Sequence, residues 1–230
     1  MRIAQTGLNL ADGKFKYQDR LFNALTEKFN PAKEVPYPFE FIGADFENAQ
    51  AIAMPREAVL DLLILDMDKI ETRLERTQDA EEQALLRKCL AHLEDQQPAC
   101  DMPLDDRERE AVRAFGLLSF KPTVLFDAPP QEALEVCRAV VEKAGMMFFF
   151  TVGKPEVHAW MVPRHADAVT CAGRIHTDLA RGFIKAEIFR VEDILACHGP
   201  QEARSKGLMQ LVDRGFPVPE NSVLEIRFNV

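Results

Sequence analysis

Apolar side chains recur every three or four positions through residues 56–110, which is the spacing of an amphipathic helix. Two such stripes lie on either side of a turn at residues 78–80, and the second ends before Pro98. This pattern predicts an antiparallel helical hairpin. The two stripes are Val59, Leu62, Leu63, Met67, Ile70 and Leu74, and then Leu86, Cys89, Leu90 and Leu93.

The segments before and after this hairpin predict an α/β arrangement. Residues 2–6 are typical of a short strand, and a glycine-bearing loop and an amphipathic helix follow before Pro31. After the hairpin, residues 121–126 and 146–152 have the pattern of buried strands with a helix between them. We expect this strand–helix–strand unit to place its two strands parallel in one sheet.

The C-terminal part predicts a small α+β module, with strands at residues 157–162, 183–189 and 223–228 and short helices between the last two. The expected fold class is therefore α/β plus α+β. Its parts are a reduced sheet from residues 1–55 and 111–145, the helical hairpin from residues 56–110, and the C-terminal module from residues 146–230.

Charge is unevenly distributed along the chain, whose formal net charge is −9. Residues 56–110 carry 8 basic and 16 acidic side chains, whereas residues 152–230 carry 10 of each. The acidic hairpin is therefore a poor surface for nucleic acid, and a contact with RNA in the C-terminal module would need a local basic patch.

The cellular setting follows from what the sequence lacks. Its apolar runs are too short to span a membrane, and its N-terminal segment has no long apolar stretch typical of a secretory signal. The 5 cysteines are scattered, without a Cys-x-x-Cys pair. We expect a cytoplasmic protein with reduced thiols, no membrane contact and no metal site.

One candidate for nucleotide binding is the loop from Gly7 to Lys14. A phosphate-binding loop has four residues between its glycines, and its Lys is followed by Ser or Thr. Here five residues separate Gly7 from Gly13, and Phe15 stands in the place of the hydroxyl. We interpret the segment as a strand-to-helix turn. The alternative is a distorted phosphate site formed by Gly7, Gly13 and Lys14.

The C-terminal module contains a longer motif. The run Arg174-Ile175-His176-Thr177-Asp178-Leu179, followed by Arg181-Gly182-Phe183-Ile184-Lys185-Ala186-Glu187, resembles the signature of the TGS domain in the YchF (Obg-like ATPase) family. Met1-Arg2-Ile3-Ala4 and Tyr37-Pro38-Phe39 resemble N-terminal segments of the same family. The resemblance implies a β-grasp fold for residues 146–230, a P-loop-like sheet for the reduced α/β part, and the ribosome or RNA as a partner.

The chain departs from the family pattern at the nucleotide site. The family reads its base with Asn-x-x-Glu, where this chain has Asp127-Ala128-Pro129-Pro130. No Asp-x-x-Gly occurs between Phe39 and Leu60, where a γ-phosphate sensor would begin. We therefore expect a non-catalytic binding or adaptor protein with no catalytic residues and no cofactor. The alternative is a nucleotide-binding protein or weak ATPase or GTPase that binds ATP or GTP with magnesium.

The signature segment also gives the candidate partner-binding residues, which are Arg174, His176, Arg181 and Lys185. Such a basic patch could contact phosphate groups of the ribosome or RNA. An equally supported alternative is that Arg174 and Lys185 pair with Asp178, Glu187 and the acidic hairpin, which leaves a protein as the partner. We expect Thr177 or Asp178 to cap the helical turn before Gly182, with His176 packed beside it.

Overall fold

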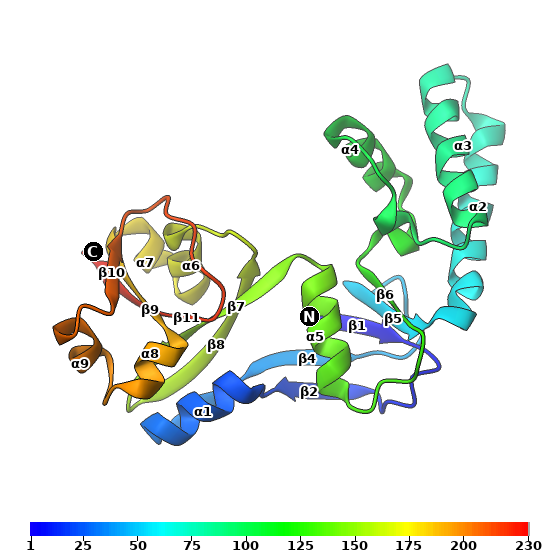
Figure 1. The fold of residues 1–230 in the computed structure, drawn as a ribbon. Helices are drawn as coiled ribbons and strands as arrows, with labels where there is room; N and C mark the ends of the chain where they lie inside the picture. The colour runs from blue at the N-terminus through cyan, green and yellow to red at the C-terminus, as the bar shows by residue number, and fades with distance from the viewer. Residues whose placement is uncertain (230) are drawn as a thin grey trace. The chain divides into compact units, whose positions relative to one another are not determined.

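The computed structural model describes residues 1–229, which form two compact units (Figure 1). The first unit contains Met1–Phe15 and Phe39–Ala144, and the second contains Lys16–Pro38 and Gly145–Val230. This division differs from the predicted one, because residues 16–38 belong to the C-terminal unit. The reason is a long-range pairing of strand β3 (Lys33–Val35), which lies parallel to β8 (Glu156–Pro163) and places Val35 opposite His158.

The first sheet has the strand order β2-β4-β1-β5-β6. Its central strand β1 is parallel to β4 and β5, and β5 is parallel to β6. In β5, Ala51 to Met54 are all buried, as expected for a strand covered on both faces. The strands are β1 (Arg2–Gln5), β2 (Gly13–Tyr17), β4 (Tyr37–Phe41), β5 (Ala51–Pro55) and β6 (Thr123–Phe126).

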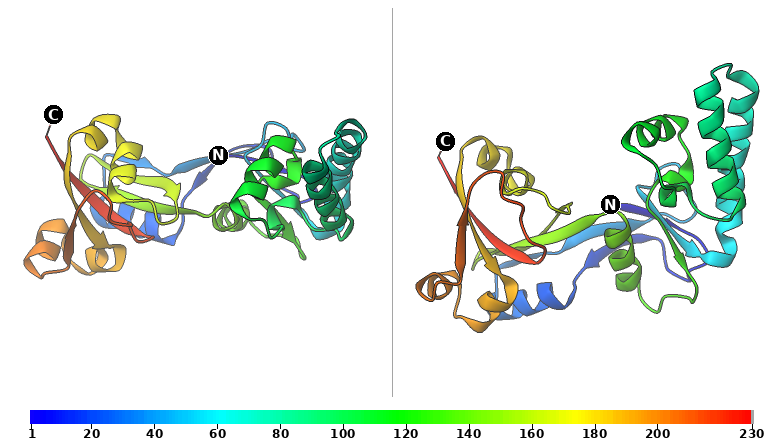
Figure 2. Two further views of the ribbon diagram at one scale, coloured as in Figure 1. Left: turned by 90° about the horizontal axis from the view of Figure 1, so that it is seen from above. Right: turned by 45° about the horizontal axis from the view of Figure 1, so that its top comes forward.

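Helices α2 (Val59–Arg76) and α3 (Ala80–Glu94) of the first unit lie side by side (Figures 1 and 2). Buried side chains of both predicted stripes form one cluster, with Leu63 of α2 and Leu86 of α3 fully buried. Asp79 is the N-cap of α3, and its carboxylate accepts hydrogen bonds from two backbone N–H groups of the first turn. The other helices of this unit are η1 (Arg56–Ala58), η2 (Ala99–Asp101), α4 (Asp106–Phe115), η3 (Leu118–Phe120) and α5 (Ala133–Lys143).

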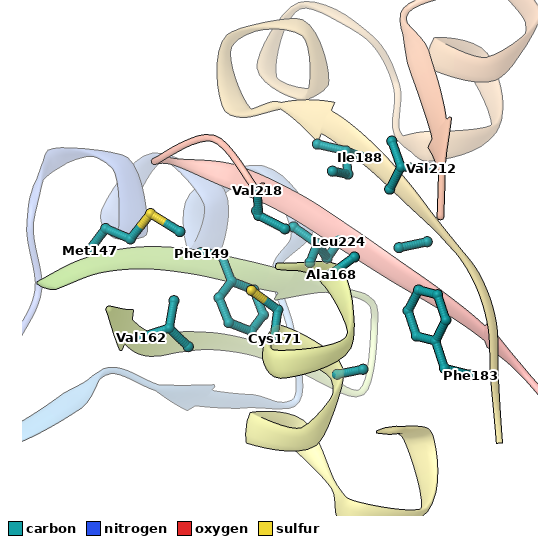
Figure 3. Close-up of a cluster of buried hydrophobic side chains, with 12 residues drawn as sticks. Met147, Phe149, Val162, Ala168, Cys171, Phe183, Ile188, Val212, Val218 and Leu224 are labelled. Atoms are coloured by element: carbon teal, nitrogen blue, oxygen red, sulfur yellow. The ribbon is translucent and has the colours of Figure 1, made fainter. Parts of the chain in front are cut away.

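The second sheet has the order β10-β9-β11-β7-β8-β3 and mixes parallel with antiparallel pairs. On one face, Cys171 and Ala168 of α6 pack against Phe149 and Leu224 of the strands (Figure 3). The remaining strands are β7 (Met146–Val152), β9 (Phe183–Arg190), β10 (Met209–Val212) and β11 (Ser222–Phe228). The helices are α1 (Arg20–Phe29), α6 (Ala168–Ile175), α7 (Thr177–Arg181), α8 (Val191–Ala196) and α9 (Pro200–Ser205).

The expected strand–helix–strand unit is wrong in its pairing. Strand β6 lies in the first sheet beside β5, whereas β7 lies in the second sheet and is antiparallel to β8. Between them, α5 ends at Lys143 and Gly145 adopts the left-handed conformation with φ +62°. The coarser prediction of a mixed α/β fold is confirmed, because the structure contains two sheets, each accompanied by helices. None of the helices within residues 1–229 is long and apolar enough to cross a membrane.

Candidate functional site

The loop after β1 leads into another strand. Gly7 has φ +69°, and a Cβ atom there would lie 3.0 Å from Cγ of Pro55, so both the turn and the close contact require glycine. Gly13 begins strand β2 and Lys14 follows it within that strand, both exposed. The expectation of a strand-to-helix turn is therefore wrong, since helix α1 begins only at Arg20. The Gly-Lys pair does not lie at a helix N-terminus, where backbone N–H groups would converge on a phosphate.

A carboxylate of the chain itself lies in this loop. Oδ1 of Asp12 accepts a hydrogen bond of 2.8 Å from the backbone N–H of Gly43 and one of 3.1 Å from Nε2 of Gln5. Gly43 follows β4, the parallel neighbour of β1. The carboxylate of Asp12 therefore connects the loop after β1 with the loop after β4, at the carboxyl ends of both strands. In a phosphate-binding loop, phosphate oxygens accept hydrogen bonds from backbone N–H groups such as that of Gly43. A carboxylate that already accepts such a bond occupies the place of the phosphate and repels it.

The chemistry expected for bound magnesium is also missing from this loop. Phe15, in the place of the metal-binding hydroxyl, contacts the ring of Phe41 with centroids 6.2 Å apart. Within residues 1–229, no group of three or more His, Cys, Asp or Glu side chains could hold a metal ion. The residues at Gly7, Gly13 and Lys14 therefore do not fit a nucleoside triphosphate with magnesium. An acid within a glycine–lysine loop is the signal by which the sequence could have shown this.

The segment in place of the base-reading motif is held by an ion pair. Strand β6 ends at Phe126, and the next residue, Asp127, accepts a hydrogen bond of 2.5 Å from Nε of Arg56. Both side chains of this pair are more than half exposed. Pro130 is buried, so the segment from Asp127 to Pro130 presents a carboxylate at its first position, but it has neither the amide of the motif nor the carboxylate three residues later.

In the second unit, His176 itself caps helix α7. Its Nδ1 accepts a hydrogen bond of 3.1 Å from the backbone N–H of Asp178. The expectation that Thr177 or Asp178 would cap this helix is therefore wrong. Because Nδ1 accepts a hydrogen bond, the ring proton of the neutral histidine lies on Nε2. The imidazole is exposed, so this proton is available to a partner.

Each cation of the signature segment has a partner within the second unit. Arg181 pairs with Asp178 at 2.8 Å, and Nζ of Lys185 lies 2.5 Å from Oδ1 of Asp213. Arg174 lies beside Tyr37; burial raises the pKa of Tyr37, and the charge of Arg174 and hydrogen bonding to it oppose that rise. Asp178 also lies 3.6 Å from Nδ1 of His176, so it connects two of the four candidate residues.

These partners differ from those of the ion-pair alternative. Glu187, which that alternative paired with Arg174 or Lys185, lies buried between Arg204 and Arg227. Arg174, His176 and Arg181 keep exposed side chains, and Lys185 is half-buried.

One cluster of polar and aromatic side chains had no signal in the sequence. The ring of His158 stacks on Trp160 with centroids 3.5 Å apart, and its Nδ1 lies 2.8 Å from the carboxylate of Glu156. Lys33 of β3 binds the same carboxylate at 2.9 Å. Burial lowers the pKa of His158, against the opposing effect of Glu156. The cluster depends on the pairing of β3 with β8, which a local sequence pattern does not reveal.

The fold and the sequence of this chain are both similar to those of known proteins. The structure of the Schizosaccharomyces pombe YchF GTPase matches it with a TM-score of 0.74, covering 98% of this chain and 97% of that chain at 17% identity. This likeness defines the class of fold. Residues 146–229 match the family YchF-GTPase_C, which is described as a protein of unknown function.

Curated relatives agree with this class. The "Ribosome-binding ATPase YchF" of Escherichia coli O157:H7 is 28% identical over 233 residues, which cover 74% of this chain and 64% of that protein. The Bacillus subtilis protein of the same name is 38% identical over 96 residues, covering 42% of this chain and 26% of its own length. "Obg-like ATPase 1" of Oryza sativa is 25% identical over 223 residues, covering 71% of this chain and 57% of its own length.

The chain is a relative of the YchF family, as the resemblance predicted. Its alignment spans 64% of the length of the Escherichia coli relative. The names of the relatives contradict one expectation. They are called ATPases and a GTPase, enzymes that act on nucleotide, so the expectation that this chain has no cofactor is wrong and we withdraw it.

Proposed function

We propose that this chain is a ribosome-associated binding protein of the YchF class that does not hydrolyse nucleotide. The observation that carries the proposal is the position of Gly13 and Lys14 on strand β2, where no helix begins. Hydrolysis requires a phosphate-binding loop, a metal ion and a positioned water. Binding of phosphate would need free N–H donors, but the loop has the carboxylate of Asp12 there. Binding of the metal ion would need a hydroxyl, but the loop has Phe15 in that place.

Nucleotide binding without turnover is compatible with this proposal. The relatives are named ATPases. The alignment with the Escherichia coli protein runs over 233 positions, but it includes only 74% of the 230 residues of this chain. The aligned region is therefore shorter here than in the relative. A shortened region that retains the fold without the hydrolytic residues would act by binding partners.

In this proposal the C-terminal part, residues 146–230, is a TGS-like β-grasp domain that provides the ribosome contact, and the acidic helices α2 and α3 bind protein. Arg174 and Arg181 support the first assignment because both are exposed although each has a partner. The name of the Escherichia coli relative supports a ribosomal partner. The cytoplasmic location stays a prediction.

Reversing the charge of both arginines tests the surface. We expect Arg174→Glu with Arg181→Glu to weaken co-sedimentation with purified ribosomes at low salt by about ten-fold, since each phosphate contact depends on a cation. The matched control is Arg190→Glu, an exposed arginine of the same unit that lies 3.7 Å from Glu192. Circular dichroism spectra of both variants should equal that of the parent.

Two results would contradict the proposal. If the parent chain does not co-sediment with ribosomes at low salt, the ribosome is not its partner. If the control loses as much binding as the double variant, the contact depends on overall charge rather than on the signature segment.

A further inference from the structure

A basic cleft of about 470 Å³ lies in the first unit, between α4, η3 and the end of α5. Three cations line it, namely Arg109, Arg113 and Lys143, together with the ring of Phe120. Among the described residues that line the cleft, the one acid is Asp101. A positively charged cleft is unusual in this part of the chain, because residues 56–110 carry twice as many acidic as basic side chains.

The walls of this cleft are fixed by local structure. Arg109 and Arg113 are four residues apart and so lie on one face of α4. That helix begins with a capping box, in which Asp105 and Glu108 each bind the other's backbone N–H. Phe120 belongs to η3, whose first two backbone N–H groups donate to the buried carboxylate of Asp66.

The three cations differ in their partners. Lys143 pairs with Asp101, and Arg113 pairs with Glu110 one turn earlier on α4. The side chain of Arg109 is half-buried and forms no ion pair or hydrogen bond within residues 1–229, although a guanidinium has five N–H donors. A partly desolvated cation without a partner is costly, and an anion in the cleft would remove that cost.

We propose that this cleft binds a small phosphate-bearing anion, with Arg109 as its main contact. The planar guanidinium fork matches the oxygens of a phosphate, and Arg113 and Lys143 add positive charge. Phe120 supplies an apolar wall on which a planar group carried by the phosphate could lie. The acidic residues of the surrounding segment disfavour a long polyanion such as RNA, so the ligand is a small molecule. This cleft shares no residue with the β1–β2 loop.

Titration of the full chain with two probes tests this assignment. We expect both inorganic phosphate and adenosine 5′-monophosphate to bind saturably at constant ionic strength, as measured by calorimetry and by amide shifts near Arg109 and Phe120. Arg109→Gln should weaken binding by about ten-fold or more, the usual effect of removing a hydrogen bond to a charged group. Because the side chain of Arg109 has no partner among the described residues, this variant should keep the parent's melting temperature.

The matched control is Arg107→Gln, which removes the same charge from the same helix. Arg107 is exposed, pairs with Glu81 at 2.8 Å and does not line the cleft. Its affinity for both probes should stay within about two-fold of the parent. Tighter binding of the monophosphate than of phosphate would identify a nucleoside as the carrier, and equal binding would identify the phosphate group alone.

The assignment is overturned if neither probe saturates by about 10 mM, beyond the millimolar affinity of a weak site. It is also overturned if Arg107→Gln weakens binding as much as Arg109→Gln does. Either failure would leave the ribosome proposal standing, because co-sedimentation tests residues of the other unit.

Discussion

Asp66→Ala is expected to lower the free energy of unfolding of the first unit by about 4 kcal/mol, because two buried N–H groups lose their acceptor. The carboxylate of Asp66 is fully buried in α2. It accepts hydrogen bonds of 2.6 Å from Leu118 and 2.8 Å from Ser119 at the start of η3. Alanine cannot replace either bond, and the space left beside these N–H groups adds to the cost. Chemical denaturation followed by circular dichroism measures the loss.

Asp68→Ala provides the control for this variant. Asp68 lies two residues further along the same helix but is exposed, so its substitution should change stability by less than about 0.5 kcal/mol. An equal effect of the two substitutions would mean that α2 does not hold η3 through Asp66. Loss of this bond would also release Phe120, so the basic cleft should lose affinity for phosphate in Asp66→Ala.

Glu187→Gln is expected to destabilise the second unit by about 3 kcal/mol at neutral pH, near the lower end for breaking a buried ion pair. Glu187 is 3% exposed on β9 and binds Arg204 at 2.5 Å and Arg227 at 2.7 Å. Arg227 is about half exposed and Arg204 keeps a second acid, Glu225, so solvent and that partner reduce the penalty.

The effect of this substitution should depend on pH. Burial would raise the pKa of Glu187, but hydrogen bonds and charge from Arg204 and Arg227 together hold it below the usual value. As the pH falls from about 4.3, the unfolded chain takes up a proton that folded Glu187 does not bind, so its stabilising effect is lost. The stability difference between parent and Glu187→Gln should therefore be full at neutral pH and shrink in acid.

The control for Glu187 is Glu225→Gln, which removes the more exposed acid bound to the same arginine. It should cost less than about 1 kcal/mol, as exposed ion pairs do. If the stability difference of Glu187→Gln is instead independent of pH, the network does not depend on ionised Glu187.

The elements that the sequence predicted well are those with long periodic patterns. Helices α2 and α3 lie where the three- and four-residue spacing placed them, and Leu63 and Leu86 are buried as expected. Strand β7 has the predicted bounds, since Met147 to Phe150 form an unbroken buried run. In each case one face or both faces of the element are buried along its whole length, and the pattern records this directly.

Short elements and long-range pairings were missed. Strand β3 has only three residues, and its partner β8 is more than a hundred residues away in the chain, so nothing local announces the pair. Helix α6 was also missed, although the sequence holds a start signal for it. That signal is Asp167, whose carboxylate accepts a hydrogen bond from the backbone N–H of Thr170.

The candidate site was predicted in the same uneven way. The spacing between Gly7 and Gly13 predicted a departure from the ordinary phosphate-binding loop, and the structure places Gly13 and Lys14 on strand β2. The bond from Gly43 to Asp12 joins loops that are 31 residues apart, and only the fold brings them together. The capping role of His176 was missed because its neighbours Thr177 and Asp178 are commoner caps.

Phosphate release from ATP and GTP in the presence of purified ribosomes tests the proposed function most directly. The chain should release no more phosphate than ribosomes alone, with an Escherichia coli YchF preparation as the active control. Nucleotide binding in the same sample would not contradict this result, because the proposal concerns turnover. Phosphate release that increases with the amount of chain and falls in Lys14→Ala would show that the β1–β2 loop is a working hydrolytic site, and would contradict the account.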